Sequence, residues 1–316
     1  MNCFRNSCPL PLAIFLVGVL CGGAITTIYY SHLEIVPYTK RSHLVLLSPS
    51  VERRLGELLF QQRKNNHKDS ILPSTHPDSV RVSCIAKNII KTLQRGLQHD
   101  KWRCGDLDKF KEETLVSRKE TVKAQSSSLV PQTRHLEGLN WEVLVVKNSK
   151  VNAYCMPGGK IVIFTGLLDH LRTDAEIATV IGHEIAHVIA SHHAEKVTRE
   201  LAFVVVRLIL LHFCDIGYIP DAMYKLLLQL PFSRRMEKEA DYIGLLLMAS
   251  AGYDPHVAPS VYEKLGQIKK KSRPHYISTH PSPKERAELL SQAEVMEEAR
   301  SVYADAVSGH VVSGFL

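Results

Sequence analysis

Ile181-Gly182-His183-Glu184-Ile185-Ala186-His187-Val188 is the stretch around which the rest of the chain is interpreted. It contains the pattern His-Glu-x-x-His inside an apolar run that is typical of a helix. Residues four apart share one face of a helix, so His183 and His187 can bind one metal ion. Glu184 reaches the same place from the side, where it can act on a water molecule. The pattern predicts a hydrolytic metal site, with two chance histidines on a core helix as the alternative.

Length and composition describe an ordinary globular protein. The chain has 316 residues, 45% hydrophobic and 22% charged residues, and a net charge of +7. It is long enough for one large domain or two small ones, and its mild basicity favours an anionic membrane surface. No nucleic-acid motif or dense basic stripe is present, so nucleic acid is not expected as a partner. None of the seven cysteines forms a C-x-x-C pair, which excludes a cysteine zinc site.

The segment 10–30 is predicted to be a transmembrane anchor. Residues 6–33 contain no Asp, Glu, Lys or Arg, and about 20 apolar residues span a bilayer as a helix. A cleaved signal peptide is the alternative, although no cleavage site follows. Arg5 lies before the segment and Lys40 and Arg41 after it, which weakly favours a body on the side of synthesis. The start lacks the Arg- and Ser-rich composition of a transit peptide.

Hydrophobic periodicity organises the rest of the chain. A helix with Leu55, Leu58 and Leu59 on one side is expected near 50–62, and a scaffold helix over 79–97. The boundaries that follow are a short N-terminus at 1–9, the anchor at 10–30, a connector at 31–78, a scaffold helix with a charged insertion at 79–138, a metallopeptidase domain at 139–295 and a tail at 296–316.

A small sheet is predicted directly before the metal-binding helix. Residues 141–146, 151–156 and 160–164 are rich in β-forming side chains, with Pro157-Gly158-Gly159 as a turn. Thr173 and Glu176 form a capping box that starts the helix carrying the two histidines. The later apolar run 201–213 is expected to be a buried core helix, with a segment resting against the membrane as the alternative.

A hydrolytic zinc site needs a third protein ligand, and two options exist. His193 has the spacing of a known pattern, but that pattern needs a glycine where Ala190 stands, so the helix is expected to continue and to point His193 away.

Glu237 is the other option, from a second helix. Asp241 lies one turn further on and could accept a hydrogen bond from a ligating histidine. Glu239 lies about 200° round the same helix from Glu237 and is expected to face solvent.

Four blocks of sequence resemble one family. They are Asn152 to Leu168, His183 to His187 with His192, Ser233 to Asp241, and His280-Pro281-Ser282 with Arg286. These blocks resemble the membrane-associated zinc metallopeptidases that include the CAAX prenyl protease and the HtpX-like and BepA-like proteases. Within that family the chain is most similar to the Oma-type peptidases of the mitochondrial inner membrane, in their plant form, on the segment Glu34 to Arg41 and on Leu46-Leu47-Ser48-Pro49.

The resemblance implies an α+β fold of the gluzincin type, mostly α-helical with a small β-sheet, after one transmembrane helix. It implies one zinc ion per subunit, held by His183, His187 and Glu237, with Glu184 as general base. It also raises His280 as a catalytic donor for the developing oxyanion, while Arg286 is expected to order its loop or to pair with a carboxylate. The substrate is expected along the sheet edge formed by Asn152, Ala153, Tyr154, Pro157, Gly158 and Gly159.

The implied function is endoproteolysis of membrane or misfolded proteins in inner-membrane quality control, with the bilayer as a partner and a homo-oligomer left open. A non-catalytic membrane scaffold or chaperone is the alternative, but a scaffold has no chemical need for Glu184. A prenyl-protein protease would need several spanning helices, and an aminopeptidase would need an acidic motif for the substrate N-terminus; the sequence shows neither.

Overall fold

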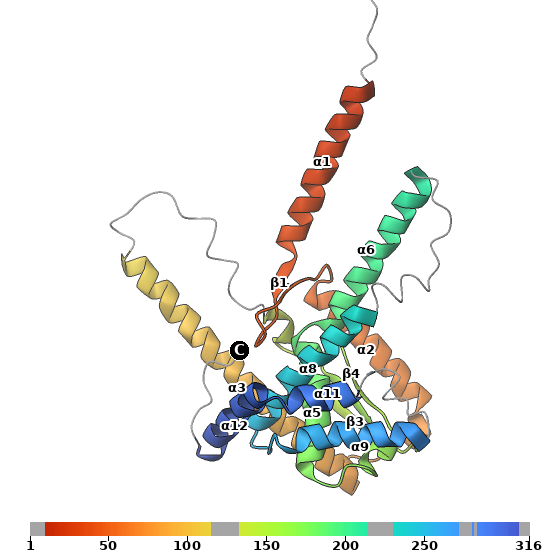
Figure 1. Cartoon of the computed structure of the whole chain (residues 1–316), viewed down its shortest axis with the longest axis vertical. Coiled ribbons are helices and arrows are strands. Elements are labelled where there is room, and N and C mark those ends of the chain that lie inside the picture. Colours follow the sequence, from red (N-terminus) through yellow and green to blue (C-terminus); the bar gives the residue numbers. More distant parts are fainter. Residues whose placement is uncertain (1–9, 115–132, 214–229, 272–279, 281–282, 310–316) are drawn as a thin grey trace, which may run out of the picture.

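The structure is a computed structural model that describes residues 10–114, 133–213, 230–271, 280 and 283–309. These residues are mostly helical and include a three-stranded and a two-stranded sheet (Figure 1). The helices are α1 (Leu10–Ser31), α2 (Pro49–Asn66), α3 (Pro77–Thr114), α4 (Thr165–Leu168), α5 (Asp174–Ile189), α6 (His192–Phe213), α8 (Leu230–Ser250), α9 (Val257–Lys271), α11 (Pro283–Leu290) and α12 (Ala293–Val307). The strands are β1 (Leu33–Ile35), β2 (Ser42–Leu44), β3 (Glu142–Val146), β4 (Ala153–Met156) and β5 (Lys160–Phe164).

The three-stranded sheet separates two hydrophobic clusters. Its order is β3-β5-β4, with β3 parallel and β4 antiparallel to β5. Side chains alternate between the faces of a strand, so Ile161 and Ile163 join the main core with α3 and α5. Val162 and Phe164 point the other way and pack with Phe60 of α2. β4 therefore forms one edge of the sheet and lies next to α5.

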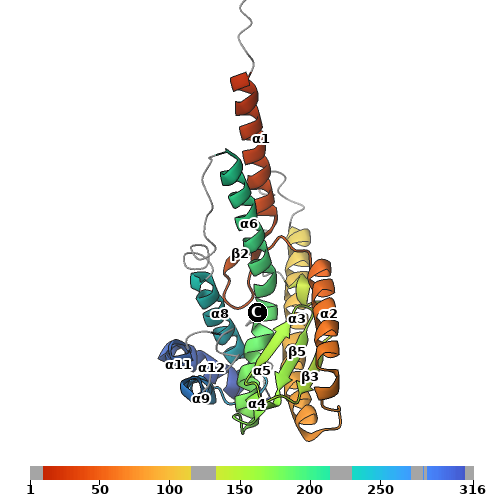
Figure 2. The same cartoon turned by 90° about the vertical axis from the view of Figure 1, so that its right-hand side faces the viewer.

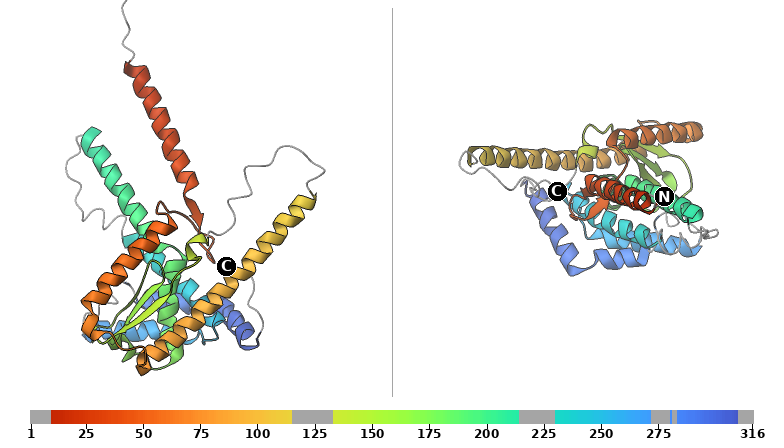
Figure 3. Two further views of the ribbon diagram at one scale, coloured as in Figure 1. Left: turned by 180° about the vertical axis from the view of Figure 1, so that it is seen from behind. Right: turned by 90° about the horizontal axis from the view of Figure 1, so that it is seen from above.

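Helices α8, α9, α11 and α12 form a further layer on the side away from α2 and α3, as the view from above shows (Figure 3). The main core runs between this layer and α5, where Ile181, Leu246 and Tyr262 are all at most 2% exposed. Burial of such side chains stabilises the fold by about 1.5–3 kcal/mol each. The layer thus holds α5 firmly from the side opposite the sheet.

Several predictions from the sequence are confirmed. The scaffold helix lies within α3, the three strands form where they were expected, and a helix covers 50–62. The capping box is complete: the Thr173 hydroxyl accepts from the Glu176 backbone N–H at 3.2 Å, and the Glu176 carboxylate accepts from the Thr173 N–H at 3.0 Å. α3 extends further than predicted, to Thr114, and the expected insertion at 115–132 lies outside the described residues.

The leucine side of α2 is only partly buried: Leu59 packs against the cluster around Phe60, whereas Leu55 is 36% exposed. Leu58 is 71% exposed, and the buried residues are Glu52, Gly56 and Phe60. Gly56 decides this orientation, because a Cβ there would lie 1.8 Å from the carbonyl oxygen of Pro157. The helix packs its glycine on the turn between β4 and β5, and periodicity of leucines alone could not reveal that contact.

The predicted core helix at 201–213 is wrong. Its apolar side chains at Leu201, Val204, Val205, Val206, Leu208 and Ile209 are exposed. α6 and α1 both project from the same side of the body (Figures 1 and 2). None of the described helices combines the length and the apolar composition that crossing a bilayer requires.

Candidate metal centre

The helix α5 carries the two histidines into the protein interior. His183 is fully buried and His187 is 8% exposed. Their rings stand nearly perpendicular with centroids 4.7 Å apart, and the two Nε2 atoms are 3.1 Å apart. The spacing of four residues along the helix therefore aims both Nε2 atoms at one point, as the pattern predicted.

Two glycines bring α8 unusually close to α5. A Cβ on Gly182 would lie 2.8 Å from the carbonyl oxygen of Gly244, and a Cβ on Gly244 would lie 2.7 Å from the backbone nitrogen of His183. Only glycine allows the two backbones to meet at this distance. The contact places Glu237 and Asp241, further back along α8, against the histidines of α5.

Four buried side chains converge on one point: His183, His187, Glu237 and His280, whose potential ligand atoms all lie within 4.8 Å of one another. The Glu237 carboxylate oxygens are 3.5 Å from each Nε2 atom of the α5 histidines. His280 Nδ1 lies 2.7 Å from Glu237 and 3.2 Å from His183 Nε2. Imidazole nitrogens and a carboxylate at this spacing fit a zinc ion.

The electrostatics of the cluster suit a cation. Burial alone would raise the pKa of Glu237, but the charge on His280 and hydrogen bonds from His183 and His280 hold that pKa well below its usual range. Burial lowers the pKa of His187 far below 6.5, which leaves a neutral imidazole whose lone pair can bind a metal. The site therefore offers the carboxylate of Glu237 and the neutral imidazole of His187. Burial and the charge of Arg286 act to lower the pKa of His183, but hydrogen bonds to Asp241 and Glu237 raise it to about 9, so a metal ion would bind there in competition with a proton.

Glu184 lies beside the cluster with one oxygen unsatisfied. Its Oε2 accepts a hydrogen bond from the backbone N–H of Cys155 in β4 at 3.0 Å. Its Oε1 is buried, accepts no hydrogen bond from the described residues, and lies 3.5 Å from His280 Nε2. Burial raises the pKa of Glu184. A buried carboxylate oxygen without a donor is rare and marks a position where a water or substrate group can bind.

A second carboxylate lies behind His183. Asp241 is 3.0 Å from His183 Nδ1 and receives two hydrogen bonds from Arg286, at 2.6 and 2.8 Å. The Arg286 guanidinium also stacks on the ring of Tyr262, 4.0 Å from its centroid. Asp241 and Arg286 are each 2% exposed. Asp241 therefore occupies the position from which a carboxylate orients a metal-binding histidine.

The chain turns after α5 without a glycine, contrary to the prediction that the helix continues. Ala190 caps the helix, and Ser191 adopts a positive φ of 47°. The turn directs His192 back to the site, where its Nδ1 lies 2.8 Å from Nδ1 of His187. His193 is not part of the four-residue cluster, and its ring centroid is 6.5 Å from that of His187.

The prediction that Glu239 faces solvent is wrong. Its side chain is buried and bonds to His192, Thr39 and Arg41, at 3.1 Å to His192 and 2.8 Å to Arg41. The helical angle correctly separated Glu239 from Glu237, but the segment that follows α1 covers that side of α8. No pattern in the sequence indicated this contact, because it joins residues about two hundred positions apart.

The predicted substrate block divides into two parts. Asn152, Ala153 and Tyr154 lie at or on β4, the edge strand beside Glu184, and the Oδ1 atom of Asn152 is buried without a hydrogen bond from the described residues. The turn Pro157-Gly158-Gly159 is buried beneath α2, and a Cβ on Gly159 would lie 2.8 Å from the ring of Trp141. The turn therefore has a packing role, and its expected contact with substrate stays a prediction.

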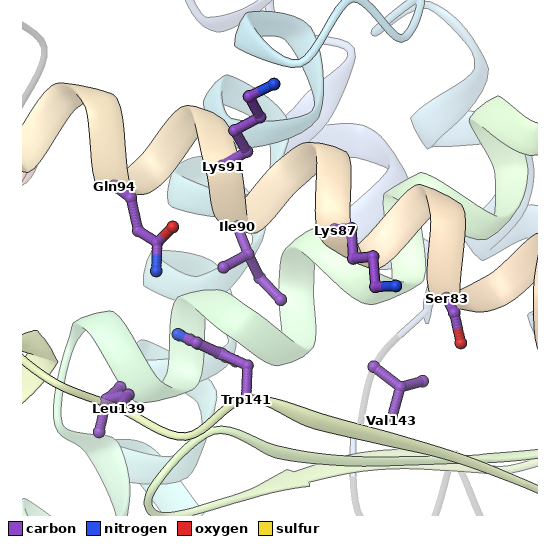
Figure 4. Close-up of a pocket in the computed structure, with 8 residues that line it drawn as sticks. All are labelled: Ser83, Lys87, Ile90, Lys91, Gln94, Leu139, Trp141 and Val143. Atoms are coloured by element: carbon purple, nitrogen blue, oxygen red, sulfur yellow. The ribbon is translucent and has the colours of Figure 1, made fainter.

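A surface cavity lies elsewhere, between α3 and β3 (Figure 4). Figure 4 shows Lys87 and Lys91 on one side and Trp141 on the other. None of its lining residues belongs to the metal cluster. The buried cluster at α5 and α8, which is separate from this cavity, is the candidate reactive centre.

A His-Glu-x-x-His helix with a glutamate from a second helix is the arrangement of one class of zinc metallopeptidases. The chain belongs to peptidase family M48, whose profile matches residues 117–294. It is 44% identical to "Mitochondrial metalloendopeptidase OMA1" of Arabidopsis thaliana over 349 residues, which cover 97% of this chain and 70% of the relative. It is 31% identical to the protein of the same name from Schizosaccharomyces pombe, over 90% of this chain and 74% of the relative. The Saccharomyces cerevisiae protein of that name is 28% identical, over 87% and 73%. The resemblance predicted from the sequence is confirmed, and the chain is a metalloendopeptidase.

Proposed function

We propose that this metalloendopeptidase uses one zinc ion to cleave membrane or misfolded proteins in quality control at the mitochondrial inner membrane. The observation that carries the proposal is the buried convergence of His183, His187 and Glu237 beside a carboxylate with an unsatisfied oxygen, Glu184. The name shared by the relatives, mitochondrial metalloendopeptidase, supports the compartment.

The metal would be held by two imidazoles of α5 and the carboxylate of α8. A bound zinc ion supplies two effects, a lower pKa for a bound water and polarisation of the scissile carbonyl. The protein must then keep His183 and His187 in the tautomers that leave Nε2 free to bind. Asp241, 3.0 Å from His183 Nδ1, supports this tautomer on one side.

Glu184 is the general base in this proposal. Its Oε2 is fixed by the Cys155 backbone N–H, so the unsatisfied Oε1 is the atom that takes a proton from the attacking water. Burial raises the pKa of this carboxyl, which brings it toward the range where it can accept a proton and return it to the leaving amine. Glu184→Gln keeps the size of the side chain and removes this capacity.

His280 has two roles open to it. Its Nε2 faces Glu184 at 3.5 Å, where an N–H can stabilise negative charge on the substrate oxygen. Its Nδ1 faces Glu237 and His183, where it would serve as a further metal ligand. A catalytic zinc site keeps one position open for water, which favours the donor role during turnover.

The substrate backbone is proposed to add to β4 as a further strand. β4 is an edge strand, and its Cys155 N–H already contacts Glu184, so a peptide along this edge would pass the general base. The residues on this edge are Asn152, Ala153 and Tyr154. The unsatisfied Oδ1 of Asn152 supports a polar contact there.

Membrane tethering through the segment 10–30 is part of the proposal. The segment contains no Asp, Glu, Lys or Arg, and Val19, Leu20 and Ile25 are exposed on α1. α6, whose apolar side chains are exposed, projects from the same side of the body as α1 (Figure 2). An apolar surface of this kind favours lipid over water. Alkaline carbonate extraction of isolated mitochondria tests the tether: protein that leaves with the soluble fraction contradicts it.

The function is tested by comparing wild type and Glu184→Gln as full-length proteins. The assay is cleavage of casein and of a detergent-solubilised membrane protein, with and without a chelator. Wild type is expected to cleave and to lose activity with the chelator, while the variant is expected to retain metal and not to cleave. Equal cleavage by both proteins would assign the activity to other residues and contradict Glu184 as the general base.

A further inference from the structure

The segment that follows α1 reaches the rear of the metal site. It forms the hairpin of β1 and β2, and its turn carries Thr39 and Arg41 between α6 and α8. The guanidinium of Arg41 lies between the carboxylates of Glu195 on α6 and Glu239 on α8. His43 of β2 adds a contact of 2.9 Å to Glu195. Both carboxylates and His43 are buried.

Arg41 bonds to both carboxylates in a geometry that lysine could not copy. Its Nε atom donates to both oxygens of Glu239, at 3.0 and 2.8 Å. Its two terminal nitrogens donate to Glu195 at 3.1 and 2.7 Å. The planar fork of a guanidinium suits such paired contacts, whereas an ammonium group is a point charge. Arg41 thereby fixes the carboxylate of Glu239 in one orientation.

Glu239 in turn contacts a histidine that touches the metal cluster. His192 Nε2 is 3.1 Å from Glu239 Oε2, and His192 Nδ1 is 2.8 Å from His187 Nδ1. Since His187 directs Nε2 to the cluster, its Nδ1 carries the proton and donates it to His192 Nδ1. His192 then carries its own proton on Nε2 and donates it to Glu239. The hydrogen bonds thus run from His187 through His192 to Glu239, whose carboxylate also accepts hydrogen bonds from Arg41.

The two histidines of α5 are supported differently. His183 has a carboxylate directly at its Nδ1, from Asp241. Among the described residues, the Nδ1 atom of His187 contacts His192 instead of a carboxylate, and Glu239 lies behind His192. A carboxylate behind a metal-binding histidine fixes its tautomer and ring orientation. The route from Arg41 supplies His187 with the support that Asp241 gives to His183.

We propose that Arg41 is a positioning residue for the metal site, acting through Glu239 and His192 on His187. The hairpin beside the proposed anchor is therefore part of the metal site, and a change in its position alters how tightly the metal is held. This inference rests on the proposed function, because it takes His187 to be a metal ligand. It assigns to residues 39–43 a role in metal binding rather than only in linking α1 to α2.

The test measures zinc affinity of the full-length protein by competition with a chromophoric chelator. Arg41→Ala is expected to raise the dissociation constant about 10- to 100-fold, the usual effect of losing an outer-shell partner. The dissociation constant of Arg41→Lys should lie between those of wild type and Arg41→Ala, because lysine keeps the positive charge but lacks the planar guanidinium. The matched control is Arg81→Ala, which removes an arginine paired to Asp174 at the other end of α5 at 2.6 Å; its affinity should equal that of wild type.

A second readout separates positioning from general destabilisation. Cobalt is substituted for zinc, and the visible absorption of the bound cobalt reports the geometry of its ligands. Arg41→Ala and His192→Ala should change this spectrum in the same way, and the double variant should be no worse than His192→Ala because all act along one route. Arg81→Ala should leave the spectrum unchanged.

The outcomes distinguish the inference from the proposed function. If wild type binds no zinc, the proposed function fails. If wild type binds zinc and Arg41→Ala binds it equally with the same cobalt spectrum, only the inference is overturned. Should Arg41→Ala not fold, Arg41→Lys and Glu239→Gln decide: wild-type affinity and spectrum in both would overturn the inference, and weakened binding in both supports it.

Discussion

Replacing Gly244 by alanine tests how the close contact of α5 and α8 builds the metal site. The added Cβ would lie 2.7 Å from the backbone nitrogen of His183 and 2.9 Å from the carbonyl carbon of Gly182. Both neighbours are backbone atoms, so no side chain can rotate away. Ordinary contact begins at 3.4 Å, and the two helices must therefore separate by about 0.7 Å at this point.

The change in stability of Gly244→Ala is the difference between two opposing effects. Alanine favours a helix over glycine by about 1 kcal/mol, which alone would stabilise the variant. Overpacking of a close-packed interior costs about 1–3 kcal/mol, because backbone shifts are forced. The net loss of about 0–2 kcal/mol lowers the melting temperature by about 0–8 °C for a domain of this size. Glu237 moves with α8, and since zinc sites tolerate ligand displacements of only about 0.2 Å, affinity should fall as well.

The assay combines thermal unfolding with zinc competition on the full-length protein. Gly182→Ala should behave like Gly244→Ala, since its Cβ would lie 2.8 Å from the Gly244 carbonyl oxygen. Gly23→Ala is the matched control, because it changes a helical glycine on α1 with no neighbouring atom within 4 Å. If Gly244→Ala unfolds at the wild-type temperature and binds zinc equally well, the close contact is not what places Glu237.

Further predictions concern single side chains. Glu237→Ala should abolish retention of zinc through gel filtration, measured by metal analysis, whereas zinc retained at wild-type stoichiometry would exclude Glu237 as a ligand. His280→Ala should retain zinc but lose cleavage activity if its role is to donate to the substrate oxygen; loss of both would make it a ligand. Burial lowers the pKa of His135, which bonds to the Ile189 carbonyl, to about 4 from 6.5. Because the unfolded chain takes up this proton first, the stability from a neutral His135 is present above pH 6.5 and is lost as pH falls toward 4. Urea unfolding measures the free energy of unfolding at pH 7 and at pH 5. Between these two pH values, His135→Gln should lose about 2 kcal/mol less of this free energy than wild type, and equal losses would contradict a buried neutral imidazole.

The sequence predicted those features that depend on neighbouring residues. Four-residue spacing placed His183 and His187 on one face, and the Thr173–Glu176 capping box began the helix where the structure has it. The alternation of β-forming residues gave the three strands. These signals are local, so they could be recognised without knowledge of the fold.

Features that depend on distant contacts could not be predicted in this way. Glu239 was expected at the surface because its helix angle differs from that of Glu237, yet Arg41 covers it. The chain turns at Ser191, which adopts a positive φ, although the sequence has no glycine there to indicate a turn. The sequence does not distinguish Gly244 from any other helical glycine, because its importance depends on the contact with α5 in the folded protein. In each case the deciding neighbour lies in a different segment of the chain.

Residues 201–213 differ most clearly from the sequence prediction. A core helix was expected over 201–213, because apolar runs of this length are usually buried. α6 instead exposes Leu201, Val205 and Leu208 and extends from the same side of the body as α1 (Figure 1). Hydrophobicity alone does not distinguish the interior of a protein from a surface that contacts lipid.

The most direct test of the central claim is the zinc content and cleavage activity of full-length Glu184→Gln measured on one preparation. We predict zinc at the wild-type stoichiometry of one ion per chain together with loss of cleavage, because Glu184 acts on the proton and does not hold the metal. Cleavage at the wild-type rate by the zinc-bound variant would contradict the assignment of Glu184 and with it the proposed chemistry of the site.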